Sequence, residues 1–395
     1  MSTSQHVLEP LEIATGLVVG LGPRLDVEAP SPPDASPLET LERAVLPALE
    51  RPPCYVSFSG GRDSSAVLAV ATHVARREGL DAPIPATNVF PEAPASDESE
   101  WQQRVVSHLA LEEWVRLEHG ADLDCVGPVA RDVLTRHGLL WPFNAYFHVP
   151  LFRLAAGGSL LTGIGGDELL SRSTWARVVD VLQGRARPQP RDLLRAGLAF
   201  APRSVRRRVL GRRLQRYPWL RPDAQREFRD AWVEQSAREP VGWVAHLDWV
   251  RRLRYLRVGV TSLQILAAHD DVVISHPFLE SSFSDAIATL PPRERFGTRG
   301  DAMRMFFADL LPGDVLARPV KTGFDTVFWN DASRRFAATW DGRGVDLALV
   351  DPDALAAEWS NDEPDPRSFL LLQAVWLAQQ GSADRLEQAL DGALQ

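Results

Sequence analysis

Lysine is almost absent from this sequence. Lys321 is the single lysine of the 395-residue chain, and every other member of its 43 Lys and Arg residues is an arginine. The codon usage of a GC-rich genome accounts for the arginines, but it does not explain the one exception. Lysine is a compact charge on a flexible stem and arginine a planar fork with five donors, so a site that needs the first cannot always accept the second. We therefore predict that Lys321 is retained for its chemistry.

Cysteine is scarce as well. Cys54 and Cys125 stand far apart and outside any CxxC or Cys/His cluster, which argues against a disulfide framework and a structural zinc site. A reducing, cytoplasmic setting fits this usage. The N-terminus has no basic segment followed by an apolar one, and no run approaches the roughly 18 uncharged apolar residues that would span a membrane. We expect an unexported, soluble protein without a membrane partner.

Positive charge is not in excess. The formal net charge is -9 at pH 7, whereas a nucleic-acid binder usually carries an excess of positive charge on one face. One dense cationic run, PRSVRRRVLGRRLQR, covers residues 202–216. We interpret it as a solvated helix face and keep RNA or an acidic partner as the alternatives.

What the sequence does contain is a regular alternation of strand and helix patterns after a Pro- and Ser-rich linker. We expect strands at 54–58, 83–90, 112–118 and 159–163, and helices at 38–50, at 63–78, from Ser96 onward, near 124–137 and near 143–156. This spacing favours right-handed crossovers and so predicts an α/β fold with a parallel sheet and helices on both faces. Ligands of such sheets bind at the carboxyl ends of the strands.

Beyond residue 170 the patterns are mostly helical. Segments 175–184, 191–200, 226–235 and 242–256 have helical spacing, and the apolar tail 368–380 is expected to be a core helix. The chain therefore divides into a short segment with a linker (1–50), an α/β core (51–170) and a mostly helical part (171–395).

The stretch SGGRDSS lies between the first predicted strand and its helix. Gly60 and Gly61 permit backbone conformations in which successive N–H groups point into one concavity, and Ser59 and Ser64 add hydroxyl groups beside it. Such a nest at a helix N-terminus suits a phosphate, although the Gly-Lys pair of a Walker A loop is absent. A carboxylate at Asp63 would repel a phosphate unless a cation lies between them, which implies Mg2+. The alternative is an ordinary strand–helix turn capped by Asp63.

A second glycine loop, TGIGGDELL, follows the fourth predicted strand. It ends in the carboxylate pair Asp167 and Glu168, and Asp167 could share one Mg2+ with Asp63. The letters GGDEL are also close to the GGDEF signature of diguanylate cyclases. That signature needs a hairpin, whereas this segment follows a buried strand.

Together, SGG-x-DS and G-x-GGDE resemble the asparagine synthetase family, which includes beta-lactam synthetases and lasso peptide cyclases. The resemblance covers about residues 50–380 and includes HPFLESSFSDAIATLPP and MRMFFADLLPGDVLARPVKTGF. It implies an adenine nucleotide alpha-hydrolase-like fold. It also implies ATP and Mg2+, activation of a carboxylate as an acyl-adenylate with release of pyrophosphate, and amide formation by an amine with release of AMP.

The resemblance also implies roles for residues at matching positions. Ser59, Gly60, Gly61, Asp63 and Ser64 would hold the pyrophosphate part of ATP, with Asp63 and Asp167 as magnesium ligands. The adenine pocket would be lined by Phe58, Val89 and Gly163. Lys321 falls where the family carries a lysine that stabilises developing charge.

The sequence departs from the family in two ways. About 50 residues precede the first loop and Ser2 stands where the glutaminase cysteine would be, so we expect no complete glutaminase domain. Ile164 replaces the glutamate of asparagine synthetases or the tyrosine of beta-lactam synthetases, and isoleucine can neither accept a proton nor donate a hydrogen bond. His276 and Glu280 lie in an altered segment, VISHPFLE, and are expected to be structural.

We therefore expect an ATP-dependent carbon–nitrogen ligase that acts on a small-molecule or peptide carboxylate and an amine. A partner protein could supply the peptide or ammonia. Two alternatives remain open: a catalytically impaired ATP-binding partner subunit, and an RNA-modifying enzyme built on the same loop.

Overall fold

The computed structural model describes residues 8–25, 35–94, 97–171, 173–211, 216–318 and 325–393. Its strands form one parallel sheet in the order β3-β2-β1-β4-β5. Their bounds are β1 (Cys54–Ser57), β2 (Ile84–Val89), β3 (Val115–Glu118), β4 (Ser159–Leu161) and β5 (Val273–Ser275). In the register, Tyr55 of β1 lies opposite Ile84 of β2 and Leu160 of β4.

The expected alternation of strands and helices is confirmed. The helices of the first half are α1 (Pro10–Thr15), α2 (Pro37–Leu49), α3 (Arg62–Glu78), α4 (Ser99–His108), α5 (Pro128–His137), η2 (Ala145–His148), α6 (Val149–Leu154) and α7 (Gly166–Leu169). Helix α2 begins with a capping box between Ser36 and Glu39, and α3 ends at Gly79 in the left-handed conformation. The helix expected from Ser96 begins instead at Ser99; Ser96 itself lies outside the described residues.

Most of the remaining chain is helical. Its helices are α8 (Ala176–Leu182), α9 (Pro190–Ala199), α10 (Arg203–Leu210), α11 (Pro222–Ala237), α12 (Trp243–Arg251), α13 (Arg254–His269), η3 (Pro277–Leu279), α14 (Ser281–Thr289), α15 (Arg299–Phe307), α16 (Gly313–Ala317), η4 (Asp325–Phe328), α17 (Asp331–Thr339), α18 (Pro352–Trp359), η5 (Pro366–Ser368) and α19 (Phe369–Ala393). The sequence patterns missed β5, and the single helix expected at 242–256 is two helices that meet at Arg252 and Leu253.

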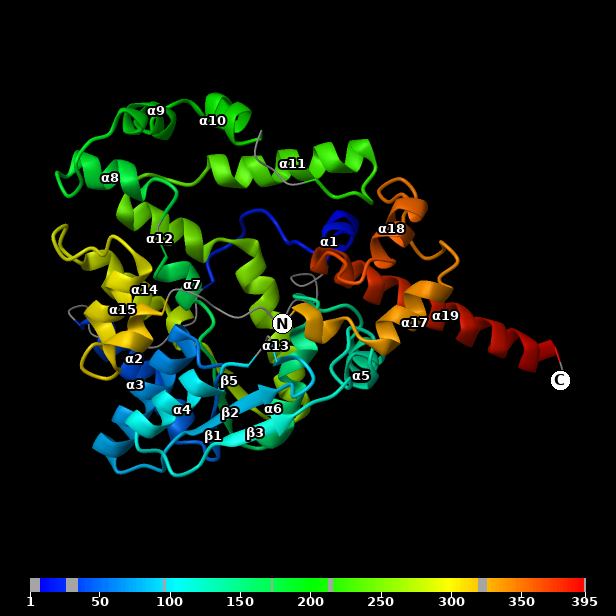
Figure 1. Ribbon diagram of the computed structural model, residues 1–395, viewed down its shortest axis with the longest axis horizontal. Helices are drawn as coiled ribbons and strands as arrows, with labels where there is room; N and C mark the ends of the chain where they lie inside the picture. Colours follow the sequence, from blue (N-terminus) through cyan, green and yellow to red (C-terminus); the bar gives the residue numbers. More distant parts are fainter. Residues whose placement is uncertain are drawn as a thin grey trace.

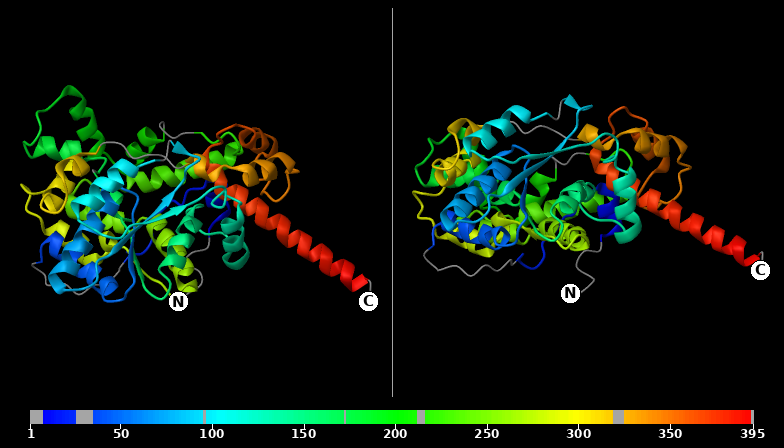
Figure 2. Two further views of the ribbon diagram at one scale, coloured as in Figure 1. Left: turned by 60° about the horizontal axis from the view of Figure 1, so that its bottom comes forward. Right: turned by 90° about the horizontal axis from the view of Figure 1, so that it is seen from below.

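The sheet has a hydrophobic core on each face. Val56 and Leu161 pack into the core that contains α2, α3 and α14. Their strand neighbours Tyr55 and Leu160 pack into the other core, with α6, α13 and α19. Figures 1 and 2 show the helices on both sides of the sheet and the end of α19 extending away from the body. The α/β prediction is confirmed, including a buried start of α19.

Residues 203–210 of the cationic run form α10, in which no residue is buried, and residues 212–215 of the run lie outside the described residues. Arg206 nevertheless has a structural role. Its guanidinium donates to the carbonyl oxygens of Leu198 and Glu239, at 3.2 and 2.9 Å, and its Cζ lies 4.8 Å from the centre of the Trp175 ring. Part of the run therefore ties α10 to its neighbouring helices. Within the described residues, no helix combines the length and apolarity needed to cross a membrane.

Candidate active site

A cavity of about 570 Å3 opens at the carboxyl ends of β1, β2 and β4. Residues from both glycine loops line it, together with side chains of α4, η2 and α15. Ile164, at the cavity wall, packs against both hydrophobic cores. The cavity therefore lies between the two hydrophobic cores, at the carboxyl ends of the strands. This is the position expected for a ligand site in a parallel sheet.

The first loop is arranged as a nest at the start of α3. Gly60 has φ 77°, a conformation that favours glycine, and Gly61 is the N-cap of α3. The hydroxyl of Ser64 donates to the Gly61 carbonyl oxygen at 3.1 Å and accepts from the Ser59 amide at 3.3 Å. These contacts hold the loop closed around the N-terminus of a 17-residue helix, whose dipole favours an anion.

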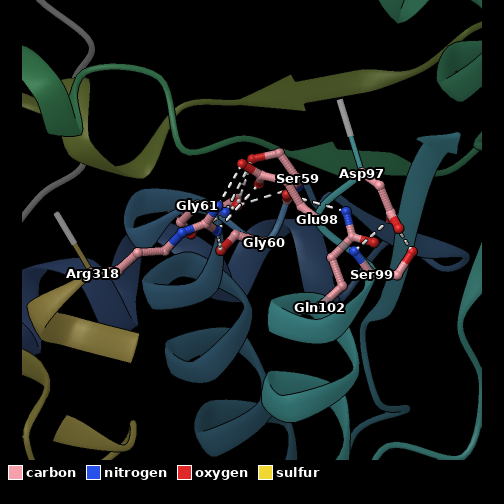
Figure 3. A network of polar contacts seen from close by, with 9 residues as sticks. Ser59, Gly60, Gly61, Asp97, Glu98, Ser99, Gln102 and Arg318 are labelled. Carbon is pink, nitrogen blue, oxygen red and sulfur yellow. Dashed lines mark hydrogen bonds and ion pairs between the residues drawn. The ribbon is translucent and has the colours of Figure 1, made fainter. Parts of the chain in front are cut away.

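A buried ion pair is hydrogen-bonded to this loop (Figure 3). Arg318 donates to the Gly60 carbonyl oxygen at 3.0 Å and pairs with Glu98 at 2.6 Å. The two side chains are 8% and 2% exposed. Gln102 of α4 donates to the Ser59 carbonyl oxygen at 3.2 Å. Glu98, Gln102 and Arg318 were not identified from the sequence, because no local motif marks them.

The second loop packs directly against the first, and its glycines make this possible. A Cβ atom at Gly163 would lie 2.7 Å from the Ser64 backbone nitrogen, and one at Gly166 would lie 2.6 Å from Asp63 Oδ1. Gly165 has φ 96°. Side chains at these positions would push the loops apart. With glycine there, the two motifs, which are far apart in the sequence, together form one wall of the cavity.

The two predicted metal-binding carboxylates are brought together. Asp63 and Asp167 both form ion pairs with the guanidinium of Arg299. Asp63 Oδ1 is buried without a hydrogen-bond partner in the described structure. Two carboxylates that share a cation and keep an unused oxygen fit the preferences of Mg2+ for oxygen ligands. Within the described residues, no group of three or more His, Cys, Asp or Glu side chains is placed to bind a metal.

Glu168, the next carboxylate, is used differently. Its Oε1 accepts a hydrogen bond from the Tyr255 hydroxyl at 3.1 Å. Burial, followed by the charge of Glu168, raises the pKa of that hydroxyl. Tyr255 therefore stays a neutral donor, and the pair connects the second loop to α13.

The predicted adenine-pocket residues divide into two groups. Phe58 and Gly163 line the cavity, whereas Val89 is not among its lining residues. The Val89 carbonyl oxygen accepts from the His119 amide at 2.9 Å. Asn88, one residue earlier, does line the cavity and donates from its side chain to the Phe147 carbonyl oxygen at 3.0 Å. Lys321 lies outside the described residues.

Histidines lie near Ile164. Thr162 Oγ1 is 2.6 Å from Nδ1 of buried His276 and accepts from the Ile164 amide at 3.3 Å. Burial, with a contribution from His148, lowers the pKa of His276 to about 3, and burial lowers that of His148, a cavity residue, to about 4. Both rings are therefore neutral at pH 7. Burial raises the pKa of Glu280 to about 7.

Arginines supply the positive charge around the cavity. Arg62, Arg299 and Arg318 all line it. Burial, followed by the charges of Arg299 and Arg318, lowers the pKa of Arg62. Such a concentration of cations beside a nest is suited to a ligand with several negative charges.

The sequence matches the asparagine synthase family over residues 38–379. The chain belongs to the asparagine synthase family. Asparagine synthase family members are ATP-dependent enzymes that form amide bonds, so the ligase class of the prediction agrees with the match. No curated protein matches the chain. The diguanylate cyclase alternative is excluded, since GGDEL follows a strand that pairs in parallel on both sides.

Proposed function

We propose that this protein activates a carboxylate with ATP and passes the acyl group to an amine. In the first step a carboxylate oxygen attacks the α-phosphorus of ATP and the bond to the bridging oxygen of pyrophosphate breaks, which gives an acyl-adenylate. The amine then attacks the acyl carbon, loses a proton and releases AMP. The observation that carries the proposal is the close packing of the two glycine loops, which places Asp63 and Asp167 on one cation beside the nest.

The residues of the cavity have distinct roles in this proposal. The amides of Gly60 and Gly61 and the hydroxyls of Ser59 and Ser64 would bind the pyrophosphate part of ATP. Asp63 and Asp167 would hold Mg2+, which when bound neutralises charge on the phosphate oxygens. Phe58 and Gly163, at the cavity wall, would contact the adenine.

Lys321 remains the proposed stabiliser of developing charge, on the basis of its motif. A preorganised cation in a site without water can contribute about 3 kcal/mol or more to transition-state stability. The nearest described residue before Lys321 is Arg318, which donates a hydrogen bond to the Gly60 carbonyl oxygen of the first loop.

The nature of Ile164 supports a substrate that differs from the aspartate and ammonia of asparagine synthetases. Its side chain cannot accept the proton of the attacking amine. We propose a small-molecule or peptide substrate of specialised biosynthesis, in the manner of lactam or lasso peptide formation, with a partner protein that delivers the peptide or ammonia. The same residue motivates the alternative of an ATP-binding partner subunit without turnover.

The test is carboxylate-dependent exchange of labelled pyrophosphate into ATP, measured with a panel of amino acids and peptides. We expect exchange with at least one carboxylate, and a loss of about 100-fold or more in Asp63→Asn and Lys321→Ala proteins. The first substitution removes a proposed metal-binding charge, and the second removes a cation proposed to stabilise developing negative charge. Asp81→Asn is the matched control, since Asp81 is exposed in the loop before β2. ATP binding without exchange for any carboxylate would contradict the proposal and favour the partner subunit.

A further inference from the structure

Arg299 lies where a divalent cation would be expected. Its Nη2 pairs with Oδ2 of Asp63, and its Nη1 pairs with Oδ1 of Asp167. The Arg299 and Asp63 side chains are 20% and 14% exposed, whereas that of Asp167 is 49% exposed. One guanidinium thus bridges two carboxylates that come from different loops, and its charge offsets part of the repulsion between them.

The main chain of Arg299 is anchored in a helix, so a change of partner would involve only its side chain. Arg299 is the first residue of α15, whose N-cap Thr298 accepts from the Asp301 amide at 3.1 Å. Met303 and Phe307 of the same helix are completely buried in one hydrophobic core. The guanidinium can therefore change partners through rotation of its own side chain, without movement of the helix.

The ion pair does not use all of its hydrogen-bonding groups. Nε of Arg299 and Oδ1 of Asp63 are both buried, and neither has a hydrogen-bond partner in the described structure. An unused donor and an unused acceptor within one contact are costly, because each has lost water without a replacement. A metal ion would satisfy the carboxylate better, and a phosphate would satisfy the guanidinium better.

Arg62 supplies a second cation for the same anion. It lines the cavity with Arg299. Among the described residues, its side chain forms no hydrogen bond and no ion pair. The guanidinium of Arg62 is thus available to a ligand, in contrast to the guanidinium of Arg299, which the two aspartates hold. An anion that reached Arg62 would also come near Arg299.

We propose that Arg299 is an exchangeable counterion that bridges Asp63 and Asp167 in the free protein and transfers to phosphate oxygens when metal and nucleotide bind together. The inference rests on the proposed function, because it assigns the same two carboxylates to the metal. A free divalent ion must compete with Arg299 for them and therefore binds weakly. A metal–polyphosphate complex supplies a metal ion for the two carboxylates and phosphate oxygens for the guanidinium of Arg299. Binding of the metal and binding of the polyphosphate therefore favour each other.

The test uses Mn2+ alone as the probe, with free Mn2+ measured by electron paramagnetic resonance in protein without nucleotide. Removal of the competing cation in Arg299→Gln should tighten Mn2+ binding at least about tenfold, within the usual range of coupling between two sites. The double variant Arg299→Gln/Asp167→Asn should lose that binding, which would locate the ion at the carboxylate pair.

Arg304→Gln is the matched control. Arg304 lies on the same helix and pairs with Asp301, outside the cavity. Its substitution should leave Mn2+ binding at the parent level. Arg299→Lys should give an intermediate affinity, because a single ammonium cannot bind two carboxylates through a planar fork. This variant also provides a test if Arg299→Gln folds poorly.

A second measurement examines the proposed contact between Arg299 and phosphate. ATP binding in EDTA, followed by calorimetry, should weaken about tenfold in Arg299→Gln and remain unchanged in Arg304→Gln. The inference would be overturned if neither Arg299→Gln nor Arg299→Lys bound Mn2+ more tightly than the parent protein. That result is independent of turnover, whereas the proposed function fails if the parent shows no carboxylate-dependent pyrophosphate exchange.

Discussion

Single glycines decide how closely the two loops of the cavity approach each other. Gly163 and Gly166 face Ser64 and Asp63 at distances that leave no room for a methyl group. The sequence indicated a nest-forming conformation for the glycines of the first loop and close backbone approach for those of the second. It could not indicate that the neighbour of each loop is the other loop, because that contact depends on the pairing of β1 with β4.

Gly166→Ala should therefore impair the cavity. The new Cβ would lie 2.6 Å from Asp63 Oδ1, so the carboxylate must shift. A displacement of about 1 Å of an active-site group can cost about 100-fold in rate, and we expect a loss of that size in pyrophosphate exchange.

Gly197→Ala serves as the comparison for that prediction. Gly197 lies within α9, and a Cβ there meets nothing within 4 Å. Its substitution should stabilise the protein by about 0.4–1 kcal/mol or leave stability unchanged, with full exchange activity. Equal activity of both variants would show that the close approach at Gly166 is unimportant.

Glu280 should make stability depend on pH. Its pKa is raised from 4.5 to about 7 by burial, so folding favours the protonated carboxyl group. This contribution is complete below pH 4.5 and is lost as the pH rises through about 7. His148 and His276 act in the opposite sense, because their lowered pKa values reduce stability as the pH falls below 6.5.

The Glu280→Gln variant separates these effects. Gln resembles the protonated acid, so the variant should match the parent at pH 4.5 and exceed it in free energy of unfolding at pH 8. Urea denaturation at several pH values measures the difference in free energy of unfolding between variant and parent. The contributions of His148 and His276 are the same in both proteins and cancel in this difference. A difference that does not change with pH would contradict the assignment.

At the scale of elements, the N-terminal end of α4 and the C-terminal end of α16 meet at the first loop. Glu98 is the N-cap of α4, and Arg318 ends α16 as its C-cap. Their ion pair fixes the carbonyl oxygen of Gly60, which places the two elements around the nest (Figure 3). The helix patterns of the sequence predicted α4, but not its contact with a residue 220 positions later.

Glu98→Gln should therefore weaken both stability and nucleotide binding. Loss of one partner of a buried ion pair leaves the other charge uncompensated and typically costs about 3–5 kcal/mol. Glu100→Gln is the control, because Glu100 is 81% exposed in its pair with Arg104 and should cost less than about 1 kcal/mol. Urea denaturation and ATP titration test both; similar values for the two variants would contradict the anchoring role.

At the scale of the whole molecule, the cavity joins the two hydrophobic cores. Ile164 packs against both, and β5 extends the sheet from a part of the chain expected to be helical. A ligand in this cavity contacts residues from both faces of the sheet, so its binding energy opposes unfolding of the entire structure.

ATP with Mg2+ should accordingly raise the Tm of the protein. A ligand at about 100 times its Kd contributes about 2.7 kcal/mol to the free energy of unfolding. Asp167→Asn should reduce the Tm increase caused by added Mg2+, whereas Asp81→Asn should keep it. Thermal denaturation with ATP in the presence of EDTA or Mg2+ measures the effect; an unchanged Tm in the parent would contradict the predicted nucleotide site.

The sequence by itself determined the features that depend on neighbouring residues: the alternation of strands and helices, the two glycine loops, and the placement of both loops at the carboxyl ends of parallel strands. Local backbone preferences and hydrophobic periodicity specify these features within a few residues. Only the tertiary structure decided which charges meet. Arg299 reaches Asp63 across 236 residues and Arg318 reaches Gly60 across 258. Such contacts leave no local pattern, because they arise from the packing of helices on the sheet.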